Sequence, residues 1–137
     1  MDEAEARARL AAAPVAHLGT VASDGRPRVV PFCFVVEGDT LYSAVDHKPK
    51  TTTRLRRLDD IAAHPDVTVL VDHYDDDWAR LWWVTVRGRA EIAAEAQPAR
   101  DLLAAKYAQY RDRPPRGPFI RVALQEWRWW SGGRRGT

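Results

Sequence analysis

The feature that most constrains the fold is a long segment, LWWVTVRGRAEIAA (81–94), in which apolar and polar residues alternate. A period of two predicts a β-strand with one buried face and one exposed face. The residues predicted to face inward are Val84, Val86, Gly88, Ala90 and Ile92. Those predicted to face outward are Thr85, Arg87, Arg89 and Glu91. A strand of this length needs partner strands on both sides, so the chain is expected to be mainly β.

Shorter segments with strand and turn signals surround this strand. Further strands are predicted at 15–23, 27–37, 40–45, 66–74 and 119–130, and helices at 2–13, 51–63 and 97–110. Turns at Asp24-Gly25 and Gly38-Asp39 predict that the first three strands form an antiparallel meander. Because so few helices separate the strands, a doubly wound parallel sheet is excluded. The pattern favours a single domain (1–137), a mainly β (α+β) fold with a six-stranded antiparallel split β-barrel and a few flanking helices.

Composition narrows the class of protein. The chain has 137 residues, of which 45% are hydrophobic and 29% charged, as in globular domains. Its 21 basic and 19 acidic residues give a net charge of +2, which is too balanced for a nucleic-acid-binding protein. No apolar run approaches the length of a membrane span, and the N-terminal segment lacks the pattern of a signal peptide. We therefore expect a cytoplasmic protein with no membrane or nucleic-acid partner.

Residues that would support unaided catalysis or metal binding are scarce. Cys33 is the only cysteine, so neither an intramolecular disulfide nor a multi-cysteine metal site can form, and its apolar surroundings predict a buried thiol. The four histidines lack metal-binding spacing, and nucleophile-elbow and phosphate-loop motifs are absent. The acidic clusters at Asp59-Asp60 and 75–77 are predicted to be solvated. If the chain is an enzyme, a cofactor is expected to supply the reactive atom.

The predicted helix at 51–63 begins with an unusual arrangement of charges. Lys50, Arg54 and Arg57 are spaced i, i+4, i+7 and so share one stripe near the helix start. The helix dipole disfavours cations there by roughly 0.3–1 kcal/mol each. Together with the free N–H groups of the first turn and the hydroxyls of 51–53, they would form an anion site. The alternative interpretation is a solvated basic face that happens to lie near a helix start.

The span from Val15 to Ile92, with the last strand, resembles the pyridoxamine-phosphate-oxidase-like superfamily of FMN-binding split β-barrels. The residues that carry the resemblance include KPKTTTRLRR (48–57) and HPDV (64–67), and they are most similar to the branch that uses the deazaflavin coenzyme F-420. The resemblance implies an oxidoreductase that transfers a hydride between coenzyme F-420 and a small electron-poor substrate, such as an enone or a quinone-like compound. Two alternatives stay open: an FMN-dependent oxidase or reductase of the pyridoxamine 5'-phosphate oxidase type, and a non-catalytic flavin- or deazaflavin-binding module.

The resemblance also implies a homodimer with two cofactor sites at the subunit interface. Residues expected to hold the cofactor phosphate are Lys50, Thr51 and Arg54. Residues expected to line the linker or ring are Ser43, Ala44, Val45 and Asp46, with Val30 and Pro31 packing on the ring. Lys48, Arg56 and Arg57 are expected to form an exit groove for the acidic tail of coenzyme F-420. No catalytic residue is assigned, since His73, Tyr74 or solvent would each serve as a proton donor.

Tryptophans are candidates for the wall that the partner chain would contribute. Trp78 is one candidate, and the others are Trp82, Trp83, Trp127, Trp129 and Trp130. Neighbours in a strand point to opposite faces, so Trp82 and Trp83 cannot both enter one core, nor can Trp129 and Trp130. We expect the outward members to contact a partner subunit or a planar ligand.

Overall fold

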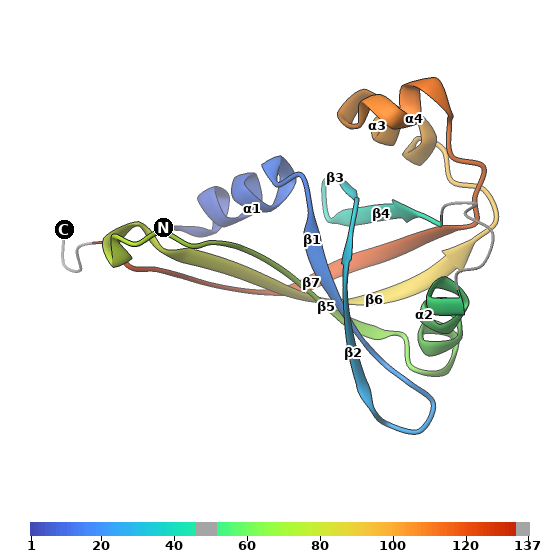
Figure 1. Ribbon diagram of the computed structural model, residues 1–137, viewed down its shortest axis with the longest axis horizontal. Coiled ribbons are helices and arrows are strands. Elements are labelled where there is room, and N and C mark those ends of the chain that lie inside the picture. The colour runs from blue at the N-terminus through green and yellow to red at the C-terminus, as the bar shows by residue number, and fades with distance from the viewer. Residues whose placement is uncertain (46–51, 134–137) are drawn as a thin grey trace.

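The computed structural model describes residues 1–45 and 52–133, with only the backbone of residues 52–55 described (Figure 1). In this part of the chain seven strands form one antiparallel sheet in the order β2-β1-β5-β6-β7-β4-β3. The strands are β1 (Ala16–Val21), β2 (Pro27–Phe32), β3 (Val35–Glu37), β4 (Thr40–Ala44), β5 (Asp66–His73), β6 (Trp82–Ala93) and β7 (Phe119–Ser131). The helices are α1 (Glu3–Ala12), α2 (Thr52–Ala63), the short η1 (Trp78–Arg80), α3 (Ala99–Lys106) and α4 (Ala108–Asp112). The predicted mainly β class is confirmed, with seven strands rather than six.

The extra strand arises because the predicted strand 27–37 is divided into β2 and β3. β2 pairs with β1 and β3 with β4, which places them at opposite edges of the sheet. The predicted three-stranded meander is therefore wrong. Pro31 lies in β2, where a residue without an N–H donor is tolerated because the strand is at an edge. The chain then crosses the molecule at Cys33 and Phe34, and Cys33 is half-buried rather than buried.

Alternation in the long central strand places the core as predicted, with one exception. Val84 and Val86 have no exposed surface, and they pack with Val69 of β5 in the main core. Ile92, which was predicted to face inward, is 41% exposed. Ala90 is the last buried residue of β6, and Ile92 lies two positions beyond it.

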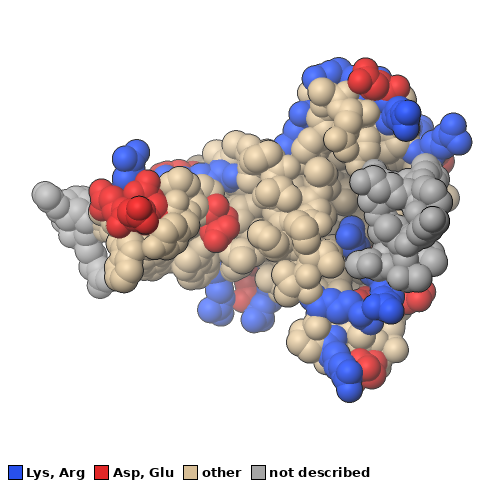
Figure 2. Space-filling model, viewed as in Figure 1, with Lys and Arg blue, Asp and Glu red and all other residues tan. Residues whose placement is uncertain are grey.

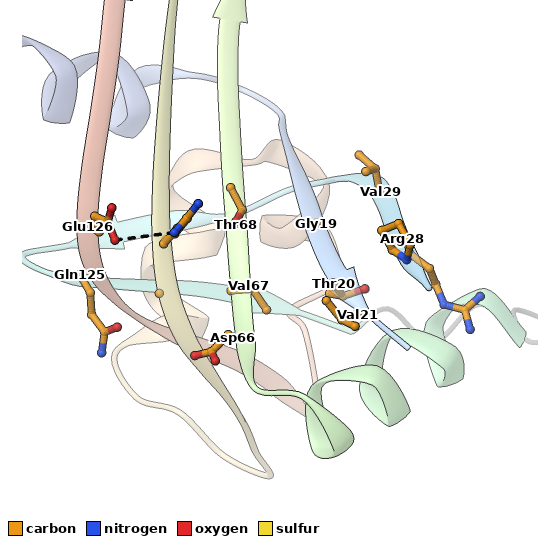
Figure 3. Close-up of a pocket in the computed structure, with 13 residues that line it drawn as sticks. Gly19, Thr20, Val21, Arg28, Val29, Asp66, Val67, Thr68, Gln125 and Glu126 are labelled. Atoms are coloured by element: carbon orange, nitrogen blue, oxygen red, sulfur yellow. Dashed lines mark ion pairs between the residues drawn. The ribbon is translucent and has the colours of Figure 1, made fainter. Parts of the chain in front are cut away.

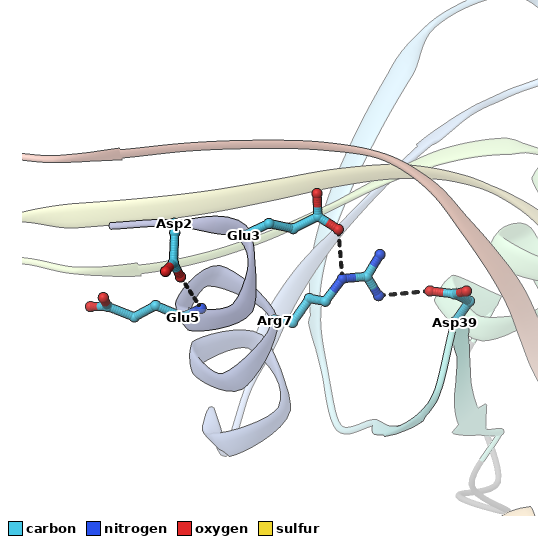
Figure 4. Close-up of polar contacts among 5 residues, drawn as sticks. All are labelled: Asp2, Glu3, Glu5, Arg7 and Asp39. Carbon is cyan, nitrogen blue, oxygen red and sulfur yellow. Dashed lines mark hydrogen bonds and ion pairs between the residues drawn. The ribbon is translucent and has the colours of Figure 1, made fainter.

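Helix α1 lies across one face of the arm formed by β5, β6 and β7 (Figure 4). The Asp2 carboxylate caps the helix by accepting from the Glu5 N–H at 2.8 Å, which satisfies one of the free donors of the first turn. The Arg7 guanidinium bonds Glu3 at 2.9 Å and Asp39 at 2.6 Å. Because Asp39 belongs to the β3–β4 turn, this ion pair joins the helix to the edge of the sheet that β4 and β3 form.

The tryptophans of β6 and β7 lie on the two faces of the arm, and α1 covers only one of these faces. Trp82, Trp127 and Trp129 pack against the core on the side that α1 covers. Trp83 and Trp130 point the other way and are 37% and 42% exposed. The predicted division of adjacent tryptophans between opposite faces is therefore confirmed.

The predicted helix 97–110 is two helices, α3 and α4, that meet at Tyr107. The backbone of Tyr107 is extended, with φ −118° and ψ 122°. Its hydroxyl hydrogen-bonds to Pro14 and Phe34 on remote segments, and this tertiary contact interrupts the helix. Leu103, Tyr110 and Phe119 form a second, smaller core beneath the two helices. None of the helices in the described part of the chain has both the length and the apolar character to cross a membrane.

Candidate functional site

The start of α2 matches the sequence prediction. The helix begins at Thr52 and has no acidic residue in its first turn. Arg56 is exposed and Arg57 half-buried, and basic side chains gather over α2 and the β1–β2 hairpin beside it (Figure 2). Arg54 lies in the first turn of the helix, but its side chain is not described. Lys50, Thr51 and Asp46 lie outside the described residues.

An acid on the same helix is removed from solvent, contrary to prediction. Asp60 is only 2% exposed, and its carboxylate accepts from the Thr20 hydroxyl at 3.0 Å and from Nε of Arg28 at 2.8 Å. Thr20 is itself 4% exposed. The predicted solvated setting holds for Asp59, which is exposed, and is wrong for Asp60, which fastens α2 to β1 and β2. The charge of the Asp60 carboxylate is therefore paired with that of Arg28 on β2.

The end of β4 is a second part of the predicted site. Ser43 is 1% exposed, and its hydroxyl donates to the Cys33 carbonyl at 2.8 Å. Ala44 is 8% exposed, and the Val45 N–H donates to the Pro118 carbonyl at 3.0 Å. The hydroxyl of Ser43 is thus engaged within the protein. Only the seven residues 45–51 separate the end of β4 from the start of α2, which limits how far apart the two parts of the predicted site can be.

The two predicted residues of β2 lie on opposite faces of the sheet. Val30 is half-buried and packs against the main core, whereas Pro31 is exposed. Because β2 is an edge strand, the polar groups along its outer edge have no neighbouring strand. A planar ligand can therefore meet the backbone of β2, but it cannot contact both side chains from one side.

Trp78 is remote from the other predicted residues of the same chain. It lies in η1, in the connection between β5 and β6, and is 69% exposed. That connection is at the far end of the arm, while β4 and α2 meet at the opposite end of the molecule (Figure 1). Within one chain the structure does not bring Trp78 together with Ser43 or Val45.

A hollow that sequence reasoning missed lies on the uncovered face of the sheet (Figure 3). It has a volume of about 640 Å³ and is lined by β1, β2, β5, β6 and β7. Arg87 and Glu126 face one another across part of it at 3.9 Å, while Arg28 turns away toward α2. Gly19, which has no side chain, is among its lining residues. None of the predicted cofactor residues lines this hollow.

Two titratable groups at the α3–α4 junction have shifted pKa values that the sequence did not suggest. Burial lowers the pKa of Lys106 from 10.5 to about 8, against a smaller opposing effect of Cys33. Burial also raises the pKa of Tyr107 from 10.0 to about 12. The sequence predicted both residues to lie in one amphipathic helix, and no local pattern indicated that their pKa values would be shifted.

The described part of the chain contains no metal-binding cluster that would support catalysis without a cofactor. No cluster of three or more metal-ligating side chains occurs among these residues. His73 stacks on Trp82 with ring centroids 6.3 Å apart, and its Nε2 lies 3.7 Å from Asp75 at the tip of the arm. That location is far from the start of α2, so one chain alone does not place His73 beside the predicted phosphate site.

Comparisons with solved structures identify the fold. A conserved hypothetical protein from Mycobacterium tuberculosis is 18% identical, with a TM-score of 0.75 over 96% of this chain and 86% of that chain. A FAD-binding protein from Mesorhizobium loti is 22% identical, with a TM-score of 0.69 over 94% of each chain. A heme binding protein from Mycobacterium smegmatis is 21% identical, with a TM-score of 0.71 over 97% of this chain and 54% of that chain. At these identities the likeness shows the fold alone.

Sequence comparison identifies the family. No curated protein matches the chain. The family model for pyridoxamine 5'-phosphate oxidase, however, matches residues 2–131, which is nearly the whole length. The split-barrel sheet and the helix that begins at Thr52 agree with that match. The chain therefore belongs to the pyridoxamine 5'-phosphate oxidase family.

Proposed function

We propose that the chain binds a flavin-type cofactor by its phosphate at the start of α2 and acts as an oxidoreductase. One observation carries the proposal: the first turn of α2 contains no acid, while the buried acid of this helix, Asp60, is engaged by Arg28. Free N–H groups, the positive end of the dipole and nearby cations together favour a phosphate. Lys50, Thr51 and Arg54 are the residues that would hold it.

The described strands suit the rest of such a cofactor. Ser43 and Ala44 end β4, and Val45 follows them directly. The outer edge of β2 offers backbone donors and acceptors to the polar edge of a heterocyclic ring, and the exposed Pro31 offers an apolar contact. These features fit a ring on β2 and a phosphate at α2, with the linker near Ser43 to Asp46.

Coenzyme F-420 is our first candidate for this cofactor. Its phosphodiester carries an acidic tail, which needs cations beyond those that hold the phosphate. Arg56 is exposed one turn into α2 and Arg57 is half-buried beside it, so both add basic residues to the helix beyond its first turn. Lys48 would add a further cation.

FMN is the second candidate, and the family favours it. The chain belongs to the pyridoxamine 5'-phosphate oxidase family, and one structural neighbour is a FAD-binding protein. A phosphomonoester suits Lys50 and Arg54 as well as a phosphodiester does. A non-catalytic module that binds either cofactor would use the same residues.

The chemistry would belong to the cofactor, which when bound accepts or donates a hydride at its ring. The residues of the chain would bind and orient it: basic groups at α2 would fix the phosphate, and β2 would fix the plane of the ring. A small electron-poor acceptor, such as an enone or a quinone-like compound, would then need to be held against that ring with water excluded. No protein nucleophile is required.

We further propose that the active form is a homodimer with the cofactor sites at the interface. The face of the sheet opposite α1 supports this, because antiparallel sheets that face water normally present polar residues. This face also presents large apolar residues: Val29, which is 68% exposed, Pro31, Leu70, Trp83 and Trp130. They lie beside polar residues of the same face, among them Thr85, Arg87 and Glu126. The five strands β2, β1, β5, β6 and β7 have 6 to 13 residues each. At about 3.3 Å per residue and about 4.8 Å between strands, they give a face on the order of 700 Å² in projection. That is comparable with the roughly 800 Å² of accessible surface that each partner buries in a standard interface.

Titration of the protein with each cofactor, followed by quenching of tryptophan fluorescence, tests the proposal. Lys50→Ala and Arg54→Ala should each lose about 1.5–3 kcal/mol of binding free energy, as expected for charge-assisted hydrogen bonds. Arg26→Ala is the matched control, since it removes an 86% exposed cation from the nearby hairpin. If the parent protein binds neither cofactor, or if both site variants bind as the parent does, the phosphate assignment is wrong.

A fourth variant separates the two cofactors. Arg56→Ala should weaken coenzyme F-420 and leave FMN unaffected, because only the former has a tail to reach this exposed residue. Tighter binding of FMN than of coenzyme F-420 by the parent would reverse our order of candidates. Turnover with reduced cofactor and a panel of enones and quinones then distinguishes an enzyme from a binding module.

A further inference from the structure

The crossover, which we define as Cys33 and Phe34 between β2 and β3, is held by side chains from distant segments. The Cys33 carbonyl accepts from the Ser43 hydroxyl at 2.8 Å. The Phe34 N–H donates to the Tyr107 hydroxyl at 3.0 Å, and the Phe34 carbonyl accepts from Nζ of Lys106 at 2.9 Å. The crossover thus obtains from side chains the hydrogen bonds that a strand would obtain from its neighbours.

Lys106 and Tyr107 join this crossover to the end of α1. Nζ of Lys106 also donates to the Ala11 carbonyl at 3.3 Å and lies 3.9 Å from the centroid of the Phe34 ring. The single hydrogen of the Tyr107 hydroxyl is shared between the carbonyls of Pro14, at 2.8 Å, and Phe34, at 3.1 Å. Two consecutive side chains at the α3–α4 junction therefore bind two segments that are remote in the sequence, residues 11–14 and the crossover.

The charge of Lys106 is held without an acid. Among the described residues no carboxylate forms an ion pair with it, and its contacts are two carbonyl oxygens and the rings of Phe34 and Tyr107. The titratable groups that face it are the Cys33 thiol and the Tyr107 phenol, while Arg111 instead donates to carbonyls of α3. A half-buried ammonium group with such partners acts through directional hydrogen bonds rather than through an ion pair, because each carbonyl oxygen fixes the orientation of one N–H bond.

This arrangement lies between the two strands that the proposed site requires. The crossover begins two residues after Pro31 of β2, and its first carbonyl accepts a hydrogen bond from Ser43 of β4. We propose that Lys106 and Tyr107 are positioning residues of the cofactor site: by fixing the crossover they set the relative placement of the ends of β2 and β4. The inference rests on the proposed function, and it assigns a role to the α3–α4 junction that neither the family match nor the structural neighbours indicate.

Three variants and one control test the inference. Lys106→Met keeps the side-chain length and removes the donors, Lys106→Arg keeps a cation, and Tyr107→Phe removes only the hydroxyl. Arg111→Met is the matched control, because it removes a cation from the same junction whose hydrogen bonds reach only Ala104 and Ala105. All four proteins are compared by thermal melting to establish that they are folded at the assay temperature.

Two readouts are measured on each protein. The first is the rate at which Cys33, the only thiol, reacts with an aromatic disulfide reagent in the absence of cofactor. The second is the dissociation constant for FMN and for coenzyme F-420. Lys106→Met and Tyr107→Phe should raise the thiol rate and weaken cofactor binding by roughly three- to tenfold, as for the loss of one or two hydrogen bonds. Lys106→Arg should restore both toward the parent, and Arg111→Met should change neither.

The outcomes separate the inference from the proposed function. If the parent binds cofactor and both disruptive variants bind it equally well, the positioning role is wrong while the cofactor assignment stands. If Lys106→Arg is as impaired as Lys106→Met, the cation does not act through the crossover, and the inference also fails. A parent protein that binds neither cofactor would overturn both proposals.

Discussion

Replacing Asp60 tests how α2 is attached to the sheet. In Asp60→Ala the buried hydroxyl of Thr20, which is 4% exposed, loses its acceptor, and Arg28 loses its ion pair. Removing one partner of a fully buried pair costs about 3–5 kcal/mol. The side chain of Arg28 is 39% exposed and can turn toward water, which lowers its share of the cost. We therefore expect a loss of about 2–4 kcal/mol in the free energy of unfolding.

Thermal and urea unfolding measure this loss. At roughly 3 °C per kcal/mol for a chain of this size, the melting temperature should fall by about 6–12 °C. Thr20→Val keeps the ion pair and removes one hydrogen bond, so it should cost only about 1 kcal/mol. Asp59→Ala is the control, since it removes the adjacent, exposed acid and should stay within about 0.5 kcal/mol of the parent. Equal melting of the Asp59 and Asp60 variants would refute the argument.

Three further predictions concern other parts of the molecule. Gly88→Ala should destabilise the fold by about 2–3 kcal/mol in urea unfolding, because the new Cβ would overlap the Ala123 carbonyl oxygen. Since burial lowers the pKa of Lys106 to about 8, the unfolded chain binds more protons between pH 8 and 10.5. The free energy of unfolding should therefore rise with pH across this window in the parent relative to Lys106→Arg, and melting curves from pH 7 to 9.5 would show it. Trp83→Ser should shift the protein toward monomer in sedimentation velocity, whereas Val15→Ser, at an apolar position that is 46% exposed in front of β1, should not.

Local patterns in the sequence predicted the individual elements well. Alternation located β6 and its buried valines, and helical spacing located α2 within one residue of its start. These signals are local, because the residues that define a face are two to four positions apart. The isolated Gly88 was also a usable signal: it marks a shift of register between β6 and β7, where a side chain would meet the neighbouring backbone.

Contacts between distant segments could not be predicted in the same way. The apolar pattern predicted one strand at 27–37. Only the pairing of β2 with β1 and of β3 with β4 shows that the two halves lie at opposite edges of the sheet. Asp60 read as one of two solvated acids, because its partner Arg28 is 32 positions away. The break between α3 and α4 depends likewise on hydrogen bonds between Tyr107 and Phe34, 73 positions away. Each of these features is decided by tertiary packing, about which local periodicity carries no information.

The fate of Asp60 bears on the unusual charge order of α2. A carboxylate in the second half of a helix opposes the dipole, and in solution it could partly offset the cations near the helix start. Here it is buried against Thr20 and Arg28, more than one turn from the first residue of the helix. The negative charge of Asp60 is therefore paired within the sheet and does not neutralise the positive first turn of the helix, where a ligand anion can bind. Cations near the first turn destabilise the helix on its own. An anionic cofactor bound there would offset that cost by interacting with both the cations and the helix dipole.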